Sequence, residues 1–357
     1  MKIAILNLSN NIAKPSTVSS YETIAYAEML RSMGSEVTII SRTVSNYTIA
    51  FNQVHDINEY DRLIVVNGAI NFFGGVENPV IIENYKLMAK YKSTIYYLFT
   101  DFRLAFKQLW PAIEKRGWGH TREDVWVDAP FVILSQGRDL VKTGAAHAKS
   151  DMNIQKIVYS PLERYKVESP EIDELIQPMI EDPDSQLIYG GSFRSGKRLK
   201  DLTEYFFNTS YDAELFGTIK FKQFKLPETG SEPTFTGKVK PQEMIAKLST
   251  GVCTLILGDA EYLDNFVTLR VWEAAMSGAV VLIDEKFDPK HLIFPDEVDR
   301  FRYVNTSDDV AELLEHIRVT PGLRKVLVDR QHQKMYEAHD EKQLHQNLYR
   351  HIIGGKL

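Results

Sequence analysis

The sequence predicts an α/β protein with two doubly wound domains, and three observations lead to this prediction. Short apolar runs alternate with helical segments, which is the pattern of βαβ units with parallel strands. The length of 357 residues suits two domains of about 100–200 residues each. An acidic, proline-bearing stretch separates the two series of runs. We therefore expect a first domain at 1–165, a linker at 166–185, a second domain at 186–335 and a C-terminal helix at 336–357.

The individual elements follow from apolar runs, helical periodicity and glycine stops. The first domain is expected to have strands at 2–6, 37–40, 62–67, 94–99, 131–134 and 157–159, with helices at 22–33 and 80–91. The second is expected to have strands at 186–189, 213–216, 252–257 and 279–283, with helices at 198–207, 241–249, 267–277 and from 323 onward. A last helix is expected at 342–352, in the C-terminal segment.

Composition limits the class of protein. Hydrophobic residues make up 44% and charged residues 25%, as in globular proteins. The single cysteine, Cys253, excludes a disulfide framework and a cysteine metal site. No stretch approaches the ~20 apolar residues of a membrane span, and the chain enters a strand pattern at once, without a signal peptide. We expect a soluble cytoplasmic protein. The net charge of −6 by itself argues against nucleic-acid binding, although the first 168 residues carry +2.

A glycine turn joins an apolar run to a helix near the middle of the chain. Gly190 and Gly191 end the run, and a helix is expected from about Lys197. Backbone N–H groups and the helix dipole at such a turn can face a phosphate, and Arg194 and Arg198 add cations suited to one. We interpret this loop as a site for a nucleotide diphosphate. The alternative is an ordinary strand–helix turn with a basic rim.

Asp101 comes shortly after the apolar strand expected at 94–99. Ligands of open α/β sheets bind beyond the carboxyl ends of the strands, so a carboxylate there is placed to act as a general base. An aspartate that caps the following turn is the alternative. Arg270 and Glu273, three residues apart, would be neighbours on one helical face. They form either a plain ion pair, or a pair in which the arginine binds phosphate and the glutamate binds ribose hydroxyls.

Two further stretches bear on nucleic-acid binding. The loop Asn71-Phe72-Phe73-Gly74-Gly75 places adjacent aromatic residues beside two glycines. It forms either an insertion wedge for a base stack or a loop that folds back on the core. Residues 101–125 interleave aromatic and basic side chains, which suits contact with a nucleic-acid backbone and exposed bases. A solvated helix with a few packed aromatic residues is the alternative.

With both halves described, the sequence resembles the phage DNA β-glucosyltransferases from the N-terminus to the last helices. The stretches that carry the resemblance are 60–67, 70–75, 88–92, 96–101, 188–196, 265–273 and 281–285. The resemblance implies the glycosyltransferase fold called GT-B, with two Rossmann-like domains facing across a cleft. It also implies a UDP-sugar donor, with UDP-glucose expected, and duplex DNA carrying 5-hydroxymethylcytosine as the acceptor.

The same resemblance implies roles for individual residues. Asp101 would be the general base, taking the proton of the hydroxymethyl group as its oxygen displaces UDP with inversion. Glu22 would lie near the sugar, and residues 71–75 would face DNA where the target nucleotide is flipped out. The residues expected to bind the donor are Gly191, Ser192, Arg194, Arg198, Gly217, Asp259, Tyr262, Arg270 and Glu273.

Several alternatives remain open on the sequence alone. The same chemistry with UDP-arabinose would make the chain a DNA arabinosyltransferase. A GT-B enzyme with a small acceptor and a non-catalytic binder of nucleotide or DNA are two further readings. No metal-ligand spacing is present, so Mg²⁺ or Mn²⁺ is expected only as an ion held loosely on the diphosphate. We expect a monomer without membrane contact, in the cytoplasm of an infected bacterium.

Overall fold

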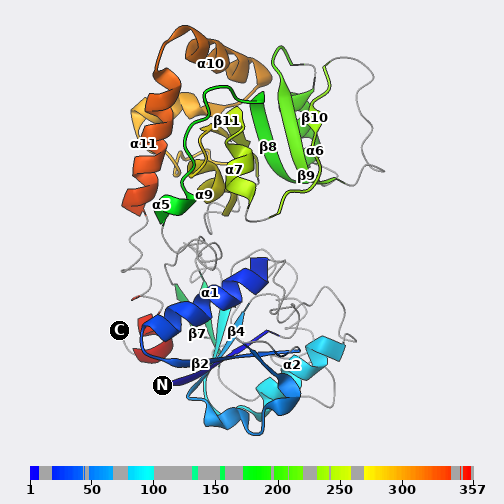
Figure 1. The fold of residues 1–357 in the computed structure, drawn as a ribbon, viewed down its shortest axis with the longest axis vertical. Helices are drawn as coiled ribbons and strands as arrows, with labels where there is room; N and C mark the ends of the chain where they lie inside the picture. The colour runs from blue at the N-terminus through cyan, green and yellow to red at the C-terminus, as the bar shows by residue number, and fades with distance from the viewer. Residues whose placement is uncertain are drawn as a thin grey trace. The chain divides into compact units, whose positions relative to one another are not determined.

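The computed structural model divides the chain into two compact units, each built on its own sheet (Figure 1). The first unit contains Met1–Glu168 and Asp340–Leu357, and the second contains Ser169–Leu263 and Val267–His339. All statements below concern the residues that the structure describes. These are 1–7, 18–42, 44, 48–66, 79–99, 131–135, 153–156, 172–193, 197–207, 209–219, 231–240, 243–258, 269–338, 346 and 349–354.

Seven strands form the first sheet in the order β3-β2-β1-β4-β5-β6-β7, and every pairing is parallel. The strands are β1 (Lys2–Leu6), β2 (Glu36–Ser41), β3 (Thr48–Ala50), β4 (Arg62–Val66), β5 (Ile95–Phe99), β6 (Phe131–Ser135) and β7 (Asn153–Lys156). The chain runs outward from β1 to β3 and resumes on the other side at β4. The topological switch, where open α/β sheets bind ligands, therefore lies between β1 and β4.

The core of the first unit forms because its central strands are apolar on both faces. Ile3 and Ile5 of β1 pack against α1 (Val18–Ser32), which contributes Ile24, Ala27 and Leu30. The helix α2 (Pro79–Lys90) precedes β5, and the short turns η1 (Phe51–Gln53) and η2 (Ile57–Glu59) connect β3 to β4. Burial on both faces is typical of parallel sheets whose crossovers are helices.

The C-terminus completes this same core. A single π-helical turn, η9 (Arg350–Gly354), places Ile352 at 0% exposure in the cluster around β1 and α1. Arg62 Nε, on β4, donates a hydrogen bond of 2.9 Å to the carbonyl oxygen of Ile352. The last residues of the chain therefore stabilise its first domain.

Six strands form the second sheet in the order β10-β9-β8-β11-β12-β13, again with every pairing parallel. The strands are β8 (Ser185–Phe193), β9 (Ala213–Ile219), β10 (Thr234–Phe235), β11 (Gly251–Ile256), β12 (Val280–Asp284) and β13 (Tyr303–Val304). The helices are α5 (Ile172–Leu175), α6 (Lys197–Phe206), α7 (Met244–Leu248), α9 (Leu269–Ala275), α10 (Ser307–Val319) and α11 (Leu323–Ala338), with the 3₁₀ segment η8 (Glu297–Arg302).

Helices cover both faces of the second sheet. Leu187 of β8 belongs to a cluster with residues of α6, α10 and α11. Ile188, the next residue, belongs to a cluster with residues of α7 and α9. Since successive side chains of a strand point to opposite faces, these clusters are two separate layers. Together with the switch between β8 and β11, this gives a doubly wound domain.

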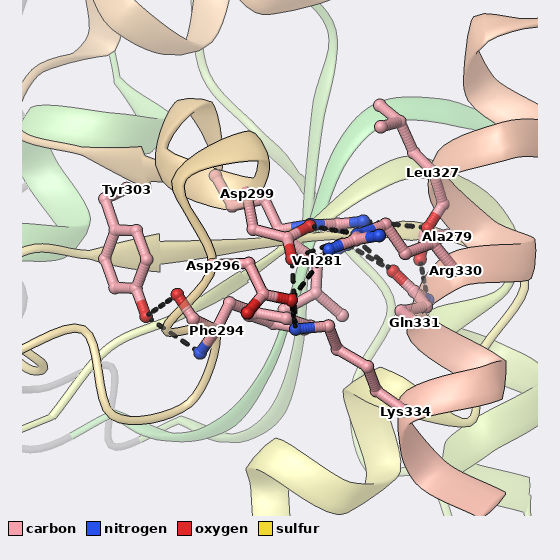
Figure 2. A network of polar contacts seen from close by, with 11 residues as sticks. Ala279, Val281, Phe294, Asp296, Asp299, Tyr303, Leu327, Arg330, Gln331 and Lys334 are labelled. Atoms are coloured by element: carbon pink, nitrogen blue, oxygen red, sulfur yellow. Dashed lines mark hydrogen bonds and ion pairs between the residues drawn. The ribbon is translucent and has the colours of Figure 1, made fainter. Parts of the chain in front are cut away.

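A buried ionic network joins α11 to the 3₁₀ segment η8 of the second unit (Figure 2). Asp299 is 0% exposed and accepts a hydrogen bond of 3.0 Å from Arg302 Nε. Arg330 and Lys334 of α11 each lie 3.1 Å from the same carboxylate. Arg302, also fully buried, donates to the carbonyl oxygen of Leu327 at 2.8 Å. Burial alone would raise the pKa of Asp299, but the bonds and charges of these cations together hold it below its usual value.

Some elements differ from the sequence prediction. The first helix begins at Val18, four residues before the expected start at 22. The strand expected at 157–159 falls outside the described residues, and β7 lies just before it, at an edge of the sheet where polar residues are tolerated. The expected helix at 342–352 is described only at Gln346, at Tyr349 and in the π-helical turn. Part of the stretch expected as a linker is folded, since Gln177 N donates to the carbonyl oxygen of Met276 at 2.9 Å.

Candidate functional site

The tips of β8 and β9 meet without side chains between them. Gly191 pairs with Gly217 in the parallel register of these strands. Gly217 has φ +132°, and a Cβ added there would come within 1.8 Å of the carbonyl oxygen of Gly191. A Cβ added to Gly190 would lie 2.2 Å from the ring of Phe216. The glycines are therefore required by the close approach of the two strands toward the carboxyl edge of the sheet.

The loop after β8 has the order that phosphate-binding turns need. β8 runs through Ser192 to Phe193, and α6 begins at Lys197, so a strand leads through a short connection into a helix N-terminus. Arg198 lies in the first turn of α6. Arg194, in the connection itself, lies outside the described residues. A ligand phosphate at this turn would meet backbone N–H groups and the positive end of the α6 dipole.

Arg270 and Glu273 form an ion pair on α9. The Arg270 Nη1 to Glu273 Oε2 distance is 3.0 Å, and the glutamate side chain is 2% exposed against 24% for the arginine. α9 is the crossover between the parallel strands β11 and β12, so its first turn lies at the carboxyl edge of the sheet. A carboxylate buried this deeply needs a cation beside it. The Arg270 guanidinium is the more exposed group of the pair.

The remaining predicted residues are described only in part or not at all. Glu22 lies in α1, where its backbone but not its side chain is described. β5 ends at Phe99, two residues before Asp101. The residues of the prediction outside the described part are Asp101, Arg194, Asp259, Tyr262, Asn71, Phe72, Phe73, Gly74 and Gly75. The structure thus brings Gly191 next to Gly217, and Arg270 next to Glu273, within one unit.

Sequence reasoning missed the residues that hold the segment after β10 against β9. The carbonyl oxygen of Gly237 accepts a hydrogen bond of 2.7 Å from Gly217 N. Glu214, 4% exposed on β9, accepts from Thr236 Oγ1 at 2.5 Å and lies 2.7 Å from Lys247 Nζ. A single carboxylate inside the apolar run 213–216 was the available signal, because a charged residue in a buried strand needs partners.

A two-domain glycosyltransferase is the class that these features define. The two doubly wound domains have the Rossmann-like topology of the GT-B fold expected from the sequence. Comparison with known proteins agrees with this. Residues 1–166 match the family model described as bacteriophage T4 beta-glucosyltransferase, and residues 198–350 match one described as glycosyl transferase-like.

Individual relatives give the same result. DNA beta-glucosyltransferase of Enterobacteria phage T4 is 43% identical, with 99% of each chain covered. A solved structure of the phage T4 enzyme, an aspartate-to-alanine mutant in complex with UDP-glucose, matches with a TM-score of 0.79 at 39% identity, covering 99% of this chain and 100% of the other. The chain belongs to the T4 β-glucosyltransferase family. The predicted fold and enzyme class, a glycosyltransferase, are therefore confirmed.

A more distant similarity concerns the fold alone. An alpha-glucosyltransferase in complex with UDP and a 13-mer DNA matches with a TM-score of 0.61 at 12% identity, covering 99% of each chain. Among the residues that the structure describes, no helix has the length and apolar character of a membrane span.

Proposed function

We propose that this protein transfers glucose from UDP-glucose to the hydroxymethyl oxygen of 5-hydroxymethylcytosine in duplex DNA, with inversion at the anomeric carbon. The observation that carries the proposal is the full-length relation, at 43% identity, to a protein named DNA beta-glucosyltransferase. Solved structures of relatives in complex with UDP-glucose suggest UDP-glucose as the donor. The close approach of Gly191 and Gly217 toward the carboxyl edge of the sheet supports the same assignment, because ligands of open α/β sheets bind at that edge.

In this proposal the second domain binds the nucleotide. Arg270 donates to the diphosphate from α9, and the neighbouring Glu273 accepts from the ribose hydroxyls. Gly217 lies along the nucleotide. Ser192, Arg194 and Arg198 complete the phosphate turn, and Glu22, Asp259 and Tyr262 contact the sugar. The cations stabilise the charge that develops on UDP as it leaves.

Asp101 is proposed as the general base. Its carboxylate takes the proton of the hydroxymethyl group while that oxygen forms a bond to the anomeric carbon. The bond from that carbon to the diphosphate oxygen breaks, and UDP leaves with the electron pair. No covalent enzyme intermediate is needed, so one base and the cations around the leaving group are sufficient. Residues 71–75 are proposed to contact DNA where the target base leaves the stack, because enzymes that do chemistry on a base commonly take it out of the duplex into an active-site pocket.

The binding of a divalent cation is considered separately from the transfer step. One solved relative holds UDP and Mn²⁺, at 40% identity and a TM-score of 0.78, with 99% of each chain covered. Within the described part of this chain, no three His, Cys, Asp or Glu side chains gather into a group that could hold a metal. Those residues therefore provide no protein cage. We propose that a cation binds through the diphosphate oxygens, and no step above is assigned to it.

The test is the intact mass of a short duplex containing 5-hydroxymethylcytosine after incubation with enzyme and one donor. UDP-glucose should add one hexose, whereas UDP-arabinose and a duplex with unmodified cytosine should give no gain. A pentose gain would replace the donor and keep the acceptor, and no gain with either donor would favour a small acceptor. Asp101→Ala should abolish transfer and retain UDP binding. Loss of UDP binding in that variant would contradict the role as base.

A further inference from the structure

We propose that Glu214 is a positioning residue for the nucleotide site, because it fixes the segment after β10 against the glycine tip of β9. The inference rests on the proposed binding of a uridine nucleotide beside Gly191 and Gly217. Glu214 lies on β9, three residues before Gly217, and has no place in the catalytic roles given above.

Three contacts attach the segment to β9. Thr236 Oγ1 donates to Glu214 Oε1 at 2.5 Å. Thr236 N donates to the carbonyl oxygen of Leu215 at 3.2 Å, and Gly217 N donates to the carbonyl oxygen of Gly237 at 2.7 Å. The contact to Glu214 is made by its side chain, and the contact to Gly237 is made by Gly217, a residue of the candidate site. The position of the Gly237 carbonyl therefore depends on what holds Thr236.

The strand pairing by itself is too short to hold this segment. β10 contains two residues, which pair with Glu214 and Leu215 and then leave the sheet. Beyond these two positions, single backbone hydrogen bonds hold Thr236 and Gly237 to β9. The Glu214 carboxylate adds a side-chain bond to Thr236 and so helps to align Gly237 with the Gly217 N–H. That bond matters because Gly217 has φ +132°, a conformation that only its surroundings fix.

The ionic partner explains why a carboxylate is tolerated at this position. Lys247 Nζ, from α7, lies 2.7 Å from the same oxygen that accepts from Thr236. Burial of a charge costs several kcal/mol unless it is paired, so an apolar residue would suit a strand flanked by Leu215 and Phe216 better for stability alone. The paired carboxylate of Glu214 instead holds Thr236 in one position. We infer that this positioning is its role.

Variants at Glu214 can be expected to fold. Glu214, Thr236 and Lys247 line a cavity of about 320 Å³ at the amino-terminal edge of the strands. A shorter side chain there enlarges an existing space and creates no new void in the core. Lys247, whose side chain is 21% exposed, can then turn to solvent.

The test compares UDP affinity by calorimetry with melting temperature in the full-length protein. Glu214→Ala and Thr236→Val should each weaken UDP binding by about tenfold, in the range that outer-shell changes produce. The double variant should be no weaker than the worse single variant, because both changes remove one contact. Glu214→Gln keeps an acceptor oxygen for Thr236 and should restore most of the affinity. KM for the UDP-sugar should rise more than kcat falls.

Asp299→Asn is the matched control, a buried carboxylate of the same unit that pairs with cations but has no contact to the glycine tips. It should lower the melting temperature and leave the UDP affinity unchanged. Glu214→Ala with lowered stability and wild-type UDP affinity would overturn the inference. A wild-type protein that binds no UDP would instead overturn the proposed function, so the two failures are distinguishable.

Discussion

Gly217 faces Gly191 across the β8–β9 pairing so closely that no side chain fits between them, since an added Cβ would lie 1.8 Å from the Gly191 carbonyl oxygen. This contact joins two residues 26 positions apart in the sequence. It lies toward the carboxyl edge of the sheet, where we propose that the diphosphate binds. Under this proposal, a change in the strand packing should change the affinity for UDP.

Gly217→Ala should weaken UDP binding by at least about tenfold and lower the melting temperature. A non-glycine residue at φ +132° costs about 1–3 kcal/mol of backbone strain, and the new methyl group must push β8 and β9 apart. Calorimetric titration with UDP and thermal unfolding measure the two effects separately.

Gly322→Ala separates strain from steric contact. Gly322 also has positive φ, +80°, but a Cβ there would meet no atom within 4 Å. This control should lose stability and keep its UDP affinity. Equal UDP affinity in both variants would show that the β8–β9 tip does not contact the nucleotide.

Arg270→Ala should weaken UDP binding about 10–100-fold, because a hydrogen bond to a charged group contributes about 1.5–3 kcal/mol. It should also reduce stability, because it removes the cation beside the buried carboxylate of Glu273. Loss of one partner costs about 3–5 kcal/mol for fully buried pairs, and less is expected here since the Arg270 side chain is 24% exposed.

Arg270→Ala combined with Glu273→Gln separates the loss of UDP affinity from the loss of stability. Stability should return toward that of the wild type, because a neutral amide replaces the buried carboxylate, while UDP affinity stays low, because this variant lacks both the phosphate contact and the proposed ribose contact. Arg318→Ala is the matched control, since Arg318 pairs with Glu315 at the same three-residue spacing but on an exposed face of α10. It should change neither quantity. Recovery of UDP affinity in the double variant would argue against a phosphate contact from Arg270.

The sequence predicts well those features that depend on neighbouring residues. The central strands β1, β4, β11 and β12 are apolar because both faces are covered, and each is expected within one residue of its observed position. The prediction for β8 is wrong at its end: the strand continues to Phe193, four residues past the expected end at 189, so Gly190 and Gly191 lie within the strand, paired with β9, and not in a turn. The Arg270–Glu273 pair follows from helical spacing alone. In contrast, β3, β10 and β13 are edge strands of two or three residues, too short to leave a periodic pattern.

Features that depend on strand register and distant partners could not be predicted. The approach of Gly217 to Gly191 requires the β8–β9 register, which a sequence does not specify. Glu214 was visible as an isolated carboxylate in an apolar run, but its partners Thr236 and Lys247 lie 22 and 33 residues further on. The burial of Arg302 likewise becomes explicable only with Leu327 and Gln331 of α11 in place.

Asp299→Asn should reduce the sensitivity of the second unit to acid. The folded pKa of Asp299 lies below its usual value of 3.8 because its cationic partners outweigh the effect of burial. The unfolded chain therefore takes up this proton first as pH falls. The stabilisation is complete above pH 3.8 and is lost as pH falls through the lower folded pKa.

Urea unfolding at pH 7 and at pH 3 measures this effect. At pH 7 the variant should be less stable by about 3–5 kcal/mol, the cost of leaving buried cations without their carboxylate. The decrease from pH 7 to pH 3 should be smaller than in the wild type. An equal decrease in both proteins would assign acid sensitivity to other carboxylates.

Ile352→Ala should destabilise the first unit although it lies at the opposite end of the chain. Ile352 is 0% exposed in the cluster around β1 and α1, and truncation of a buried isoleucine costs about 2–5 kcal/mol. The backbone contact from Arg62 to the Ile352 carbonyl can persist in this variant. Hydrogen exchange of peptides from β1 and β4 should therefore accelerate, while peptides from β11 and β12 keep their protection.

Ile180→Ala, at a position 37% exposed in the second unit, is the control and should change neither set. Faster exchange in β11 and β12 alone would mean that the C-terminal turn stabilises the second unit and not the first.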